Sequence, residues 1–225
     1  HVIDIGPGAG THGGEIVASG APQEVISNTK SLTGDYLSGR LEISTPKTRK
    51  KSNDWIEITG ASGNNLKHVN LSIPIGLLTC VTGVSGSGKS TLIRCINRLY
   101  EPTAGTILID DVNVTLANRT ELRNIRRSKV SMVFQHFALF PHKSVYENVE
   151  YGLKVQNVSG EERRDRSEEA LQLIGLGGWG DYKPESLSGG MQQRVGLARA
   201  LASGSEVLLM DEAFSALDPL IKREM

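Results

Sequence analysis

Cysteine is scarce in this sequence of 225 residues, which has only Cys80 and Cys95. No C-x-x-C pair is present, so a zinc site built on such pairs is excluded. No apolar run approaches the roughly 18 residues that a membrane-spanning helix needs, and the first residues lack a signal-peptide pattern. Two thiols in predicted buried elements suit a reducing compartment. We therefore expect a cytoplasmic protein that reaches a membrane only through a partner.

An excess of one charge is also lacking, because the chain has 25 basic and 25 acidic residues. No bulk field therefore favours nucleic acid or a membrane surface. The one concentrated charge is the segment 47–51, KTRKK, which is either a solvated linker or an arm that contacts phosphates. We favour a linker, because no aromatic residues are interleaved to stack on bases.

The segment 83–91, GVSGSGKST, is the most informative part of the chain. It fits the phosphate-binding loop G-x-x-x-x-G-K-[ST]. The apolar run 77–81 before it predicts a buried strand, and 92–99 after it predicts a helix. Glycines let successive N–H groups point inward at a polyphosphate, and the helix start adds its positive dipole. The alternative is a glycine-rich turn that matches by chance.

This loop predicts ATP and Mg²⁺ as ligands. Lys89 is expected to reach the β- and γ-phosphate oxygens, and the Ser90 hydroxyl to bind Mg²⁺. The candidate nucleotide-binding residues of the loop are Gly83, Ser85, Gly86, Ser87, Gly88, Lys89, Ser90 and Thr91.

Hydrophobic periodicity and turn residues predict the other elements. Strands are expected at 1–6, 13–20, 55–58, 69–73, 105–109, 112–114 and 130–134, and helices at 22–27, 144–153 and 161–174. The first two strands should form a hairpin. Residues 28–53 are polar, with the basic linker at their end.

Three further motifs follow the loop in a fixed order: VFQ at 133–135, LSGGMQQR at 187–194, and VLLMDE at 207–212 followed by SALD at 215–218. This order resembles ABC-type ATPases. The resemblance implies an α/β fold of the P-loop NTPase class. An ABC-type nucleotide-binding domain has a mixed central sheet, an antiparallel β subdomain and a helical signature subdomain.

The chemistry of each motif assigns a role to its polar residues. Asp211 and Ser90 would hold Mg²⁺ together with Gln135. Glu212 would take a proton from the attacking water as general base. The catalytic candidates are therefore Glu212, Gln135 and Lys89. The alternative for the pair at 211–212 is an acidic strand end that caps a loop.

The resemblance also implies a head-to-tail dimer, in which Ser188, Gly189 and Gly190 of one protomer close over ATP on the other. Residues 83–225 resemble the ATP-binding subunit of glycine betaine/proline importers, on the segments 97–105, 134–142 and 210–220. That family implies a membrane permease that contacts the loop after Gln135. The chain would then lie on the inner face of the plasma membrane.

Residues 1–93 instead resemble the excinuclease ATPase of DNA repair, on the segments 1–10, 30–39, 63–67 and 79–93. We therefore expect a chimera joined at the phosphate loop, with 1–45 the tail of a preceding cassette, 46–53 a basic linker and 54–225 an incomplete ATPase domain. A DNA-binding repair ATPase and an ATP-binding fragment without turnover are the alternative functions. The spacing from Lys89 to Ser188 disfavours repair, because it lacks that family's long insertions and zinc-binding cysteines.

Two departures from the transporter pattern bear on activity. Positions 60–62 are Gly-Ala-Ser, where an aromatic residue would stack on adenine. A stack of this kind contributes roughly 1 kcal/mol. The switch histidine of the family is expected beyond Met225, so hydrolysis by this chain is expected to be weak.

Overall fold

The computed structural model describes residues 1–7, 14–44, 48, 50–135 and 137–212. It divides the chain into two compact units, His1–Lys50 and Lys51–Met225. The boundary between the units falls inside the basic segment, where polar and charged side chains offer nothing to bury.

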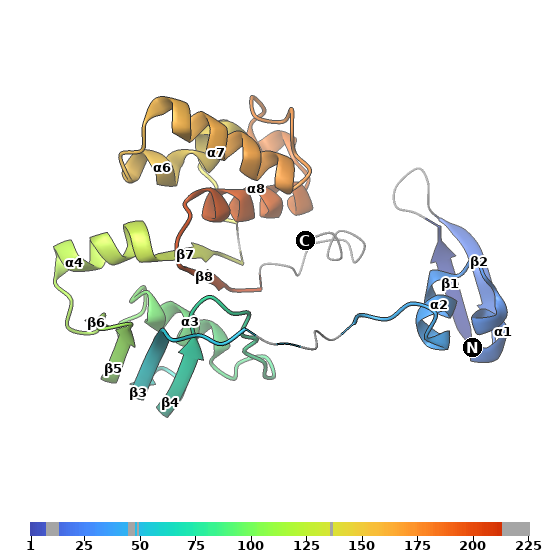
Figure 1. The fold of residues 1–225 in the computed structure, drawn as a ribbon, viewed down its shortest axis with the longest axis horizontal. Helices are drawn as coiled ribbons and strands as arrows, with labels where there is room; N and C mark the ends of the chain where they lie inside the picture. The colour runs from blue at the N-terminus through green and yellow to red at the C-terminus, as the bar shows by residue number, and fades with distance from the viewer. Residues whose placement is uncertain (8–13, 45–47, 49, 136, 213–225) are drawn as a thin grey trace. The chain divides into compact units, whose positions relative to one another are not determined.

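The first unit is a β-hairpin followed by two short helices (Figure 1). Strand β1 (Val2–Gly6) pairs antiparallel with β2 (Glu15–Gly20), which confirms the predicted hairpin. Helix α1 (Pro22–Ser27) also lies where it is predicted, and it begins with proline, which suits a first helical turn.

Helix α2 (Leu32–Ser38) was not predicted, because its segment is polar and lacks helical periodicity. Capping and a carboxylate contact stabilise it instead. The hydroxyl of Ser31 accepts a hydrogen bond from Gly34 N at 2.9 Å and donates one to Asp4 Oδ2. Thr33 donates to the other oxygen of Asp4 at 2.8 Å. The hydroxyl bonds from Ser31 and Thr33 lower the pKa of Asp4.

The second unit begins with an antiparallel sheet in the order β4-β3-β5-β6. The strands are β3 (Trp55–Gly63), β4 (Leu66–Pro74), β5 (Ala104–Ile109) and β6 (Val112–Asn113). Strands β3, β4 and β5 contain the segments predicted as strands and extend beyond them, whereas β6 ends one residue before the end of the predicted strand 112–114. Alternate side chains of β3 and β5, such as Ile58 and Ile107, are buried against helix α3 (Lys89–Ile96).

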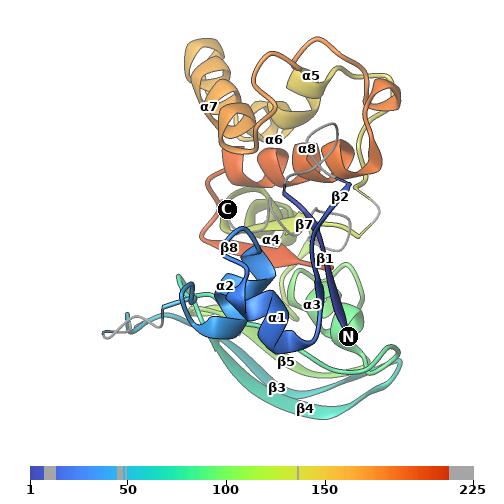
Figure 2. The same ribbon diagram turned by 90° about the vertical axis from the view of Figure 1, so that its right-hand side faces the viewer.

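A two-stranded parallel sheet lies between the antiparallel sheet and a group of helices (Figures 1 and 2). It pairs β7 (Val130–Val133) with β8 (Val207–Met210). Helix α4 (Arg119–Asn124) and a π-helical turn (Ile125–Lys129) lead into β7. Val207 and Leu209 belong to the hydrophobic core that contains α3, whereas Leu208 and Met210 pack against the helical core. The pleat of β8 thus joins the two cores.

The helical part comprises α5 (Val145–Val149), α6 (Tyr151–Val155), α7 (Gly160–Leu173) and α8 (Gly189–Ala202). A single 3₁₀ turn, Pro184–Ser186, precedes α8. Helices α5 and α6 divide the one helix predicted at 144–153. No helix among the described residues is long and apolar enough to cross a lipid bilayer.

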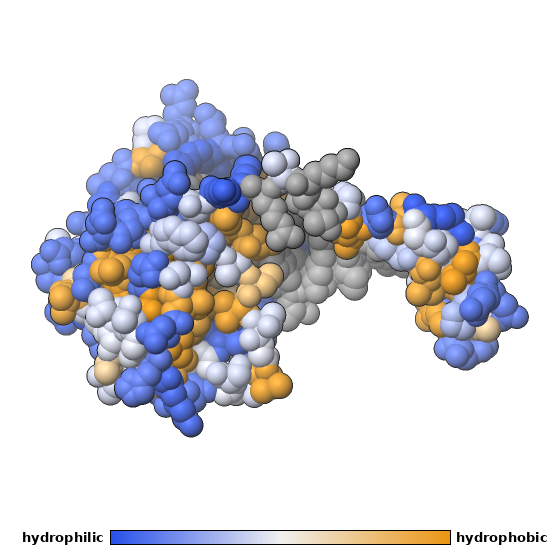
Figure 3. All heavy atoms as spheres, turned by 60° about the horizontal axis from the view of Figure 1, so that its bottom comes forward, coloured by the Kyte–Doolittle hydropathy of each residue, from blue (hydrophilic) through white to orange (hydrophobic). Residues whose placement is uncertain are grey.

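The predicted buried strand at 77–81 was wrong, because these residues form neither a strand nor a helix. Leu78 is 92% exposed, although it lies in the most apolar stretch before the loop. A strand requires a ladder partner, and within the described ranges β8 pairs with β7 and no strand pairs with 77–81. Figure 3 shows one face of the molecule, where hydrophobic residues lie at the surface between hydrophilic ones.

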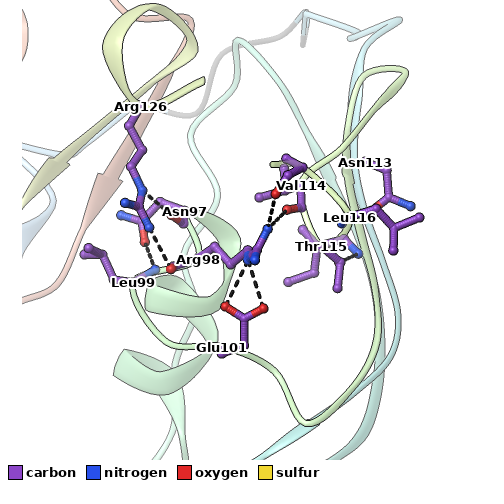
Figure 4. A network of polar contacts seen from close by, with 11 residues as sticks. Asn97, Arg98, Leu99, Glu101, Asn113, Val114, Thr115, Leu116 and Arg126 are labelled. Atoms are coloured by element: carbon purple, nitrogen blue, oxygen red, sulfur yellow. Dashed lines mark hydrogen bonds and ion pairs between the residues drawn. The ribbon is translucent and has the colours of Figure 1, made fainter. Parts of the chain in front are cut away.

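Arg98 joins the end of helix α3 to the antiparallel sheet and ends the helix three residues earlier than predicted (Figure 4). Its φ is +55°, which a right-handed helix cannot continue. The guanidinium bonds both oxygens of Glu101, at 3.0 and 2.9 Å, and the carbonyls of Val114 and Ala117, at 3.1 and 2.6 Å. Arg126 donates to the Arg98 carbonyl at 2.7 Å, so the end of α3 is fixed from two sides.

Candidate active site

The phosphate-binding loop has the backbone that its glycines predict. Gly86 and Gly88 have φ values of +80° and +99°, which a side chain at Cβ would oppose. Gly88 is also the N-cap of α3, so no side chain caps this helix. The first N–H groups of α3 are therefore available to an anion, and the helix dipole favours negative charge there.

Lys89 lies folded onto the loop. Its Nζ donates to the carbonyl oxygens of Gly83 at 2.6 Å and Val84 at 3.0 Å. These acceptors hold the ammonium beside the loop where phosphates would lie. A phosphate oxygen is a stronger acceptor for the ammonium than a neutral carbonyl.

Asn65 fastens the loop from outside, and sequence reasoning missed it. It lies in the turn between β3 and β4, and its Nδ2 donates to Gly86 O at 2.5 Å. Its Oδ1 lies 3.5 Å from the hydroxyl of Thr91. A Cβ at Gly88 would approach the Asn65 side chain to 3.1 Å. This close approach is a second reason, besides the positive φ, why glycine suits this position. Local sequence patterns contain no signal for such a contact between distant segments.

Ser90 and Asp211 are brought together although 121 positions separate them in the sequence. The Ser90 hydroxyl donates to Asp211 Oδ1 at 2.7 Å, and Asp211 is only 2% exposed. Arg94 Nη2 donates a hydrogen bond to the other carboxylate oxygen, Oδ2, at 2.9 Å. The hydroxyl of Tyr100, which accepts from Arg94, raises the pKa of the guanidinium.

The chemistry of these donors fits Mg²⁺. The ion prefers oxygen ligands and keeps several waters, so one hydroxyl and one carboxylate suffice beside phosphate oxygens. Ser90 and Asp211 supply those two groups at adjacent positions. The described residues contain no cluster of three or more His, Cys, Asp or Glu side chains, which a metal cage made by the protein alone would need.

Glu212 and Gln135 also meet. The amide of Gln135 donates to Glu212 Oε2 at 2.9 Å. The φ of Glu212 is +54°, a strained value for a residue with a side chain. Gln193 of helix α8, which is 1% exposed, lies with its Nε2 3.4 Å from the Glu212 carbonyl. Sequence reasoning missed Gln193, although it belongs to the predicted signature.

Ser188 is the N-cap of helix α8, which begins at Gly189. Its side chain accepts from Met191 N at 3.3 Å, and both Ser188 and Gly189 are exposed. Within the described ranges, no hydrogen bond or ion pair joins 188–190 to the loop 83–91. The signature and the loop of one chain therefore make separate surfaces.

The segment after Gln135 is held by the helical part. Arg199 of α8 donates to the carbonyls of Phe137 at 3.0 Å and Ala138 at 2.8 Å. Burial lowers the pKa of Arg199. The buried side chain of Asn148 both accepts from Phe140 N at 2.8 Å and donates to its carbonyl. The loop predicted to face a permease is thus anchored to α5 and α8.

Two sequence features discussed for the nucleotide site, at positions 60–62 and 215–218, are not part of this group of contacts. Positions 60–62 lie in strand β3, where their side chains supply no aromatic surface. The motif at 215–218 lies outside the described residues.

The sequence matches the model of the ABC transporter family over residues 66–215. It is 50% identical over 185 residues to the glycine betaine transport ATP-binding protein OpuAA of Bacillus subtilis, covering 81% of this chain and 43% of that protein. It is 51% identical over 170 residues to the glycine betaine/proline betaine transport system ATP-binding protein ProV of Escherichia coli, covering 76% and 42%. The chain spans less than half the length of these relatives.

Among solved structures, the fold is similar to the dimeric post-hydrolysis state of the ATP-binding cassette MJ0796 bound to ADP and Pi. The TM-score is 0.71 at 38% identity, covering 75% of this chain and 78% of that one. The predicted fold, an ABC ATPase cassette, is confirmed.

The comparisons also bear on the predicted join. The match to OpuAA is longer than the segment 83–225, so the likeness to importer subunits begins before the phosphate loop. The resemblance of residues 1–93 to the excinuclease ATPase finds no support in these comparisons. A repair function therefore has no observation in its favour beyond the sequence segments that suggested it.

Proposed function

Because the chain belongs to the ABC transporter family, we propose that it is an ATP-hydrolysing subunit that energises import of an osmolyte such as glycine betaine or proline. The observation that carries the proposal is the contact of Ser90 with Asp211 beside the phosphate loop. Half of the aligned residues are identical to those of a glycine betaine transport ATP-binding protein, which supports the solute class.

ATP binds with its phosphates over the loop 83–91. Lys89 leaves the carbonyls of Gly83 and Val84 and donates to the β- and γ-phosphate oxygens. Ser90 and Asp211, with Gln135, would hold Mg²⁺, and the ion would supply positive charge to neutralise the phosphates. The N–H groups at the start of α3 donate to the same anion.

Hydrolysis depends on Glu212 and Gln135. Glu212 accepts a proton from the attacking water, and Gln135 positions the Glu212 carboxylate for this step through the hydrogen bond that it donates to it. Glu212 directly follows Asp211, and its φ of +54° means that it does not continue the extended backbone of β8. One short segment thus presents both the metal ligand and the base.

Each complete site needs two protomers. Ser188, Gly189 and Gly190 are exposed or half-buried and make no polar contact with the loop of their own chain within the described ranges. In a head-to-tail dimer, they donate to the γ-phosphate of ATP held by the partner, at the positive end of α8. The dimeric state of the similar MJ0796 cassette supports this arrangement.

The loop after Gln135 contacts the membrane permease, on the inner face of the plasma membrane. Arg199 and Asn148 tie that loop to the helical part, so a change at the nucleotide reaches the permease through α5 and α8. In the first unit, residues 1–45 are proposed to be the tail of a preceding cassette, and 46–53 a linker to the ATPase domain 54–225.

A reconstituted transporter tests the proposed solute. The chain is combined with the permease of a glycine betaine importer in lipid vesicles, and ATP hydrolysis is measured with and without the betaine-loaded binding protein. We expect loaded binding protein to stimulate hydrolysis several-fold, because closure of the dimer completes each site. A methionine importer permease is the control. Stimulation with the control permease alone would contradict the osmolyte assignment.

A further inference from the structure

Two residues of helix α3 donate hydrogen bonds to the two oxygens of the buried Asp211 carboxylate. Ser90 and Arg94 lie four residues apart in α3, which places them on the same face. Ser90 Oγ donates to Asp211 Oδ1 at 2.7 Å, and Arg94 Nη2 donates to Asp211 Oδ2 at 2.9 Å. Within the described ranges, Arg94 is the one cation in ion-pair distance of Asp211. Lys89, the other nearby cation, is turned onto the loop carbonyls.

Arg94 is itself fixed in place. Its Nη1 donates to the hydroxyl of Tyr100 at 2.8 Å, and its guanidinium carbon lies 5.3 Å from the centre of the Tyr100 ring. The Nε is buried and has no partner among the described residues. A buried donor without a partner destabilises the fold. The ion pair of Arg94 with Asp211 therefore offsets the free energy lost at the unpaired Nε.

We propose that Arg94 is a positioning residue of the nucleotide site: it is the counter-ion of Asp211 before Mg²⁺ binds, and it weakens the binding of Mg²⁺. The first part follows from burial, because a carboxylate that is 2% exposed is strongly destabilising when its partner is removed. The second part follows from Coulomb repulsion between the guanidinium and a divalent cation that shares the same carboxylate. This inference rests on the proposed function only in taking Asp211 as a metal ligand.

The substitution Arg94→Gln separates these two effects. Without nucleotide and in EDTA, we expect the melting midpoint to fall by about 10 °C, since a buried carboxylate loses its countercharge. With ADP at a fixed concentration, Mg²⁺ is titrated while the midpoint is followed. The Mg²⁺ concentration for half of the shift should fall about tenfold, because the bound ion now supplies the missing charge.

Two matched variants keep the test decisive. Arg94→Lys retains a positive charge and should stay near the wild type in both measurements. Tyr100→Phe removes one anchor of the guanidinium and should move both values in the direction of Arg94→Gln, by about two- to threefold in Mg²⁺. It also serves if Arg94→Gln does not fold.

An unchanged midpoint of Arg94→Gln in EDTA, or a higher Mg²⁺ requirement, would overturn the inference. If Arg94→Gln is not obtained, Tyr100→Phe takes its place. An unchanged midpoint in EDTA together with an unchanged Mg²⁺ requirement for Tyr100→Phe would then overturn the inference. Failure of the proposed function has a different signature. In that case ADP with Mg²⁺ would leave the midpoint of the wild type unchanged, while the arm in EDTA would still decide the counter-ion role.

Discussion

Replacing Glu212 with Gln is expected to lower the rate of ATP hydrolysis about 1,000-fold and to leave ATP bound. The amide keeps the shape of the side chain and can still meet Gln135, whose Nε2 lies 2.9 Å from the present carboxylate. It cannot accept the proton of the attacking water, and general-base catalysis contributes roughly 10² to 10⁴ in rate. Phosphate release over time measures hydrolysis, and the midpoint shift with Mg·ATP measures binding.

Glu206→Gln is the matched control for this substitution. Glu206 lies just before β8, is exposed, and contacts Lys129 at 3.7 Å, far along the strand from the loop. An exposed ion pair contributes at most about 1 kcal/mol, so hydrolysis should stay near the wild-type rate. Equal rates for Glu212→Gln and wild type would remove Glu212 from the mechanism.

Replacing Lys89 with Ala is expected to weaken ATP binding by about 100-fold. Two charge-assisted bonds to phosphate oxygens are lost, each contributing roughly 1.5–3 kcal/mol before the lost bonds to Gly83 and Val84 are counted. Equilibrium titration of Mg·ATP measures the dissociation constant. The fold should persist, because the side chain of Lys89 is half-buried at the first turn of α3 and donates only to loop carbonyls.

Lys30→Ala removes an exposed lysine of the first unit and serves as the control for charge. It should bind Mg·ATP like the wild type. AMP provides a second comparison, since it lacks the β- and γ-phosphates. We expect Lys89→Ala to leave its weak binding unchanged, and a similar loss for AMP and ATP would show that Lys89 acts through the fold of the loop.

Local chemistry in the sequence predicted the parts of the site that lie within one motif. The glycines of 83–88 require the backbone that they adopt, and the apolar run 207–210 forms the strand that leads directly into Asp211. The motif order also placed Ser90 beside Asp211. Alternating apolar residues similarly predicted the antiparallel strands, and apolar residues at helical spacing predicted the longer helices.

Contacts between distant segments could not be predicted in this way. Asn65 and Arg94 each contact a motif from another element, and no motif of their own marks them. Gln193 lies in the predicted signature, but nothing in that motif shows that it contacts Glu212. The run 77–81 shows the opposite failure, since its composition suits a buried strand but no described strand pairs with it. Helix α2 was missed because capping by Ser31, not periodicity, stabilises it.

The proposal that two protomers build each ATP site is tested most directly by mixing inactive variants. Lys89→Ala damages the loop of a protomer, and Ser188→Arg blocks its signature at an exposed position. Each variant alone should hydrolyse ATP at a few per cent of the wild-type rate. In an equal mixture, half of the dimers carry one intact site, so we expect about a quarter of the wild-type rate.

A mixture of Lys89→Ala with Glu212→Gln is the control, because both changes damage the site on the protomer that carries them. It should show no recovery, since every mixed dimer then lacks an intact site. The decisive measurement is therefore the hydrolysis rate of the Lys89→Ala and Ser188→Arg mixture. Recovery in that mixture and not in the control is the predicted result, and an absence of recovery, or equal recovery in both mixtures, would contradict the shared site.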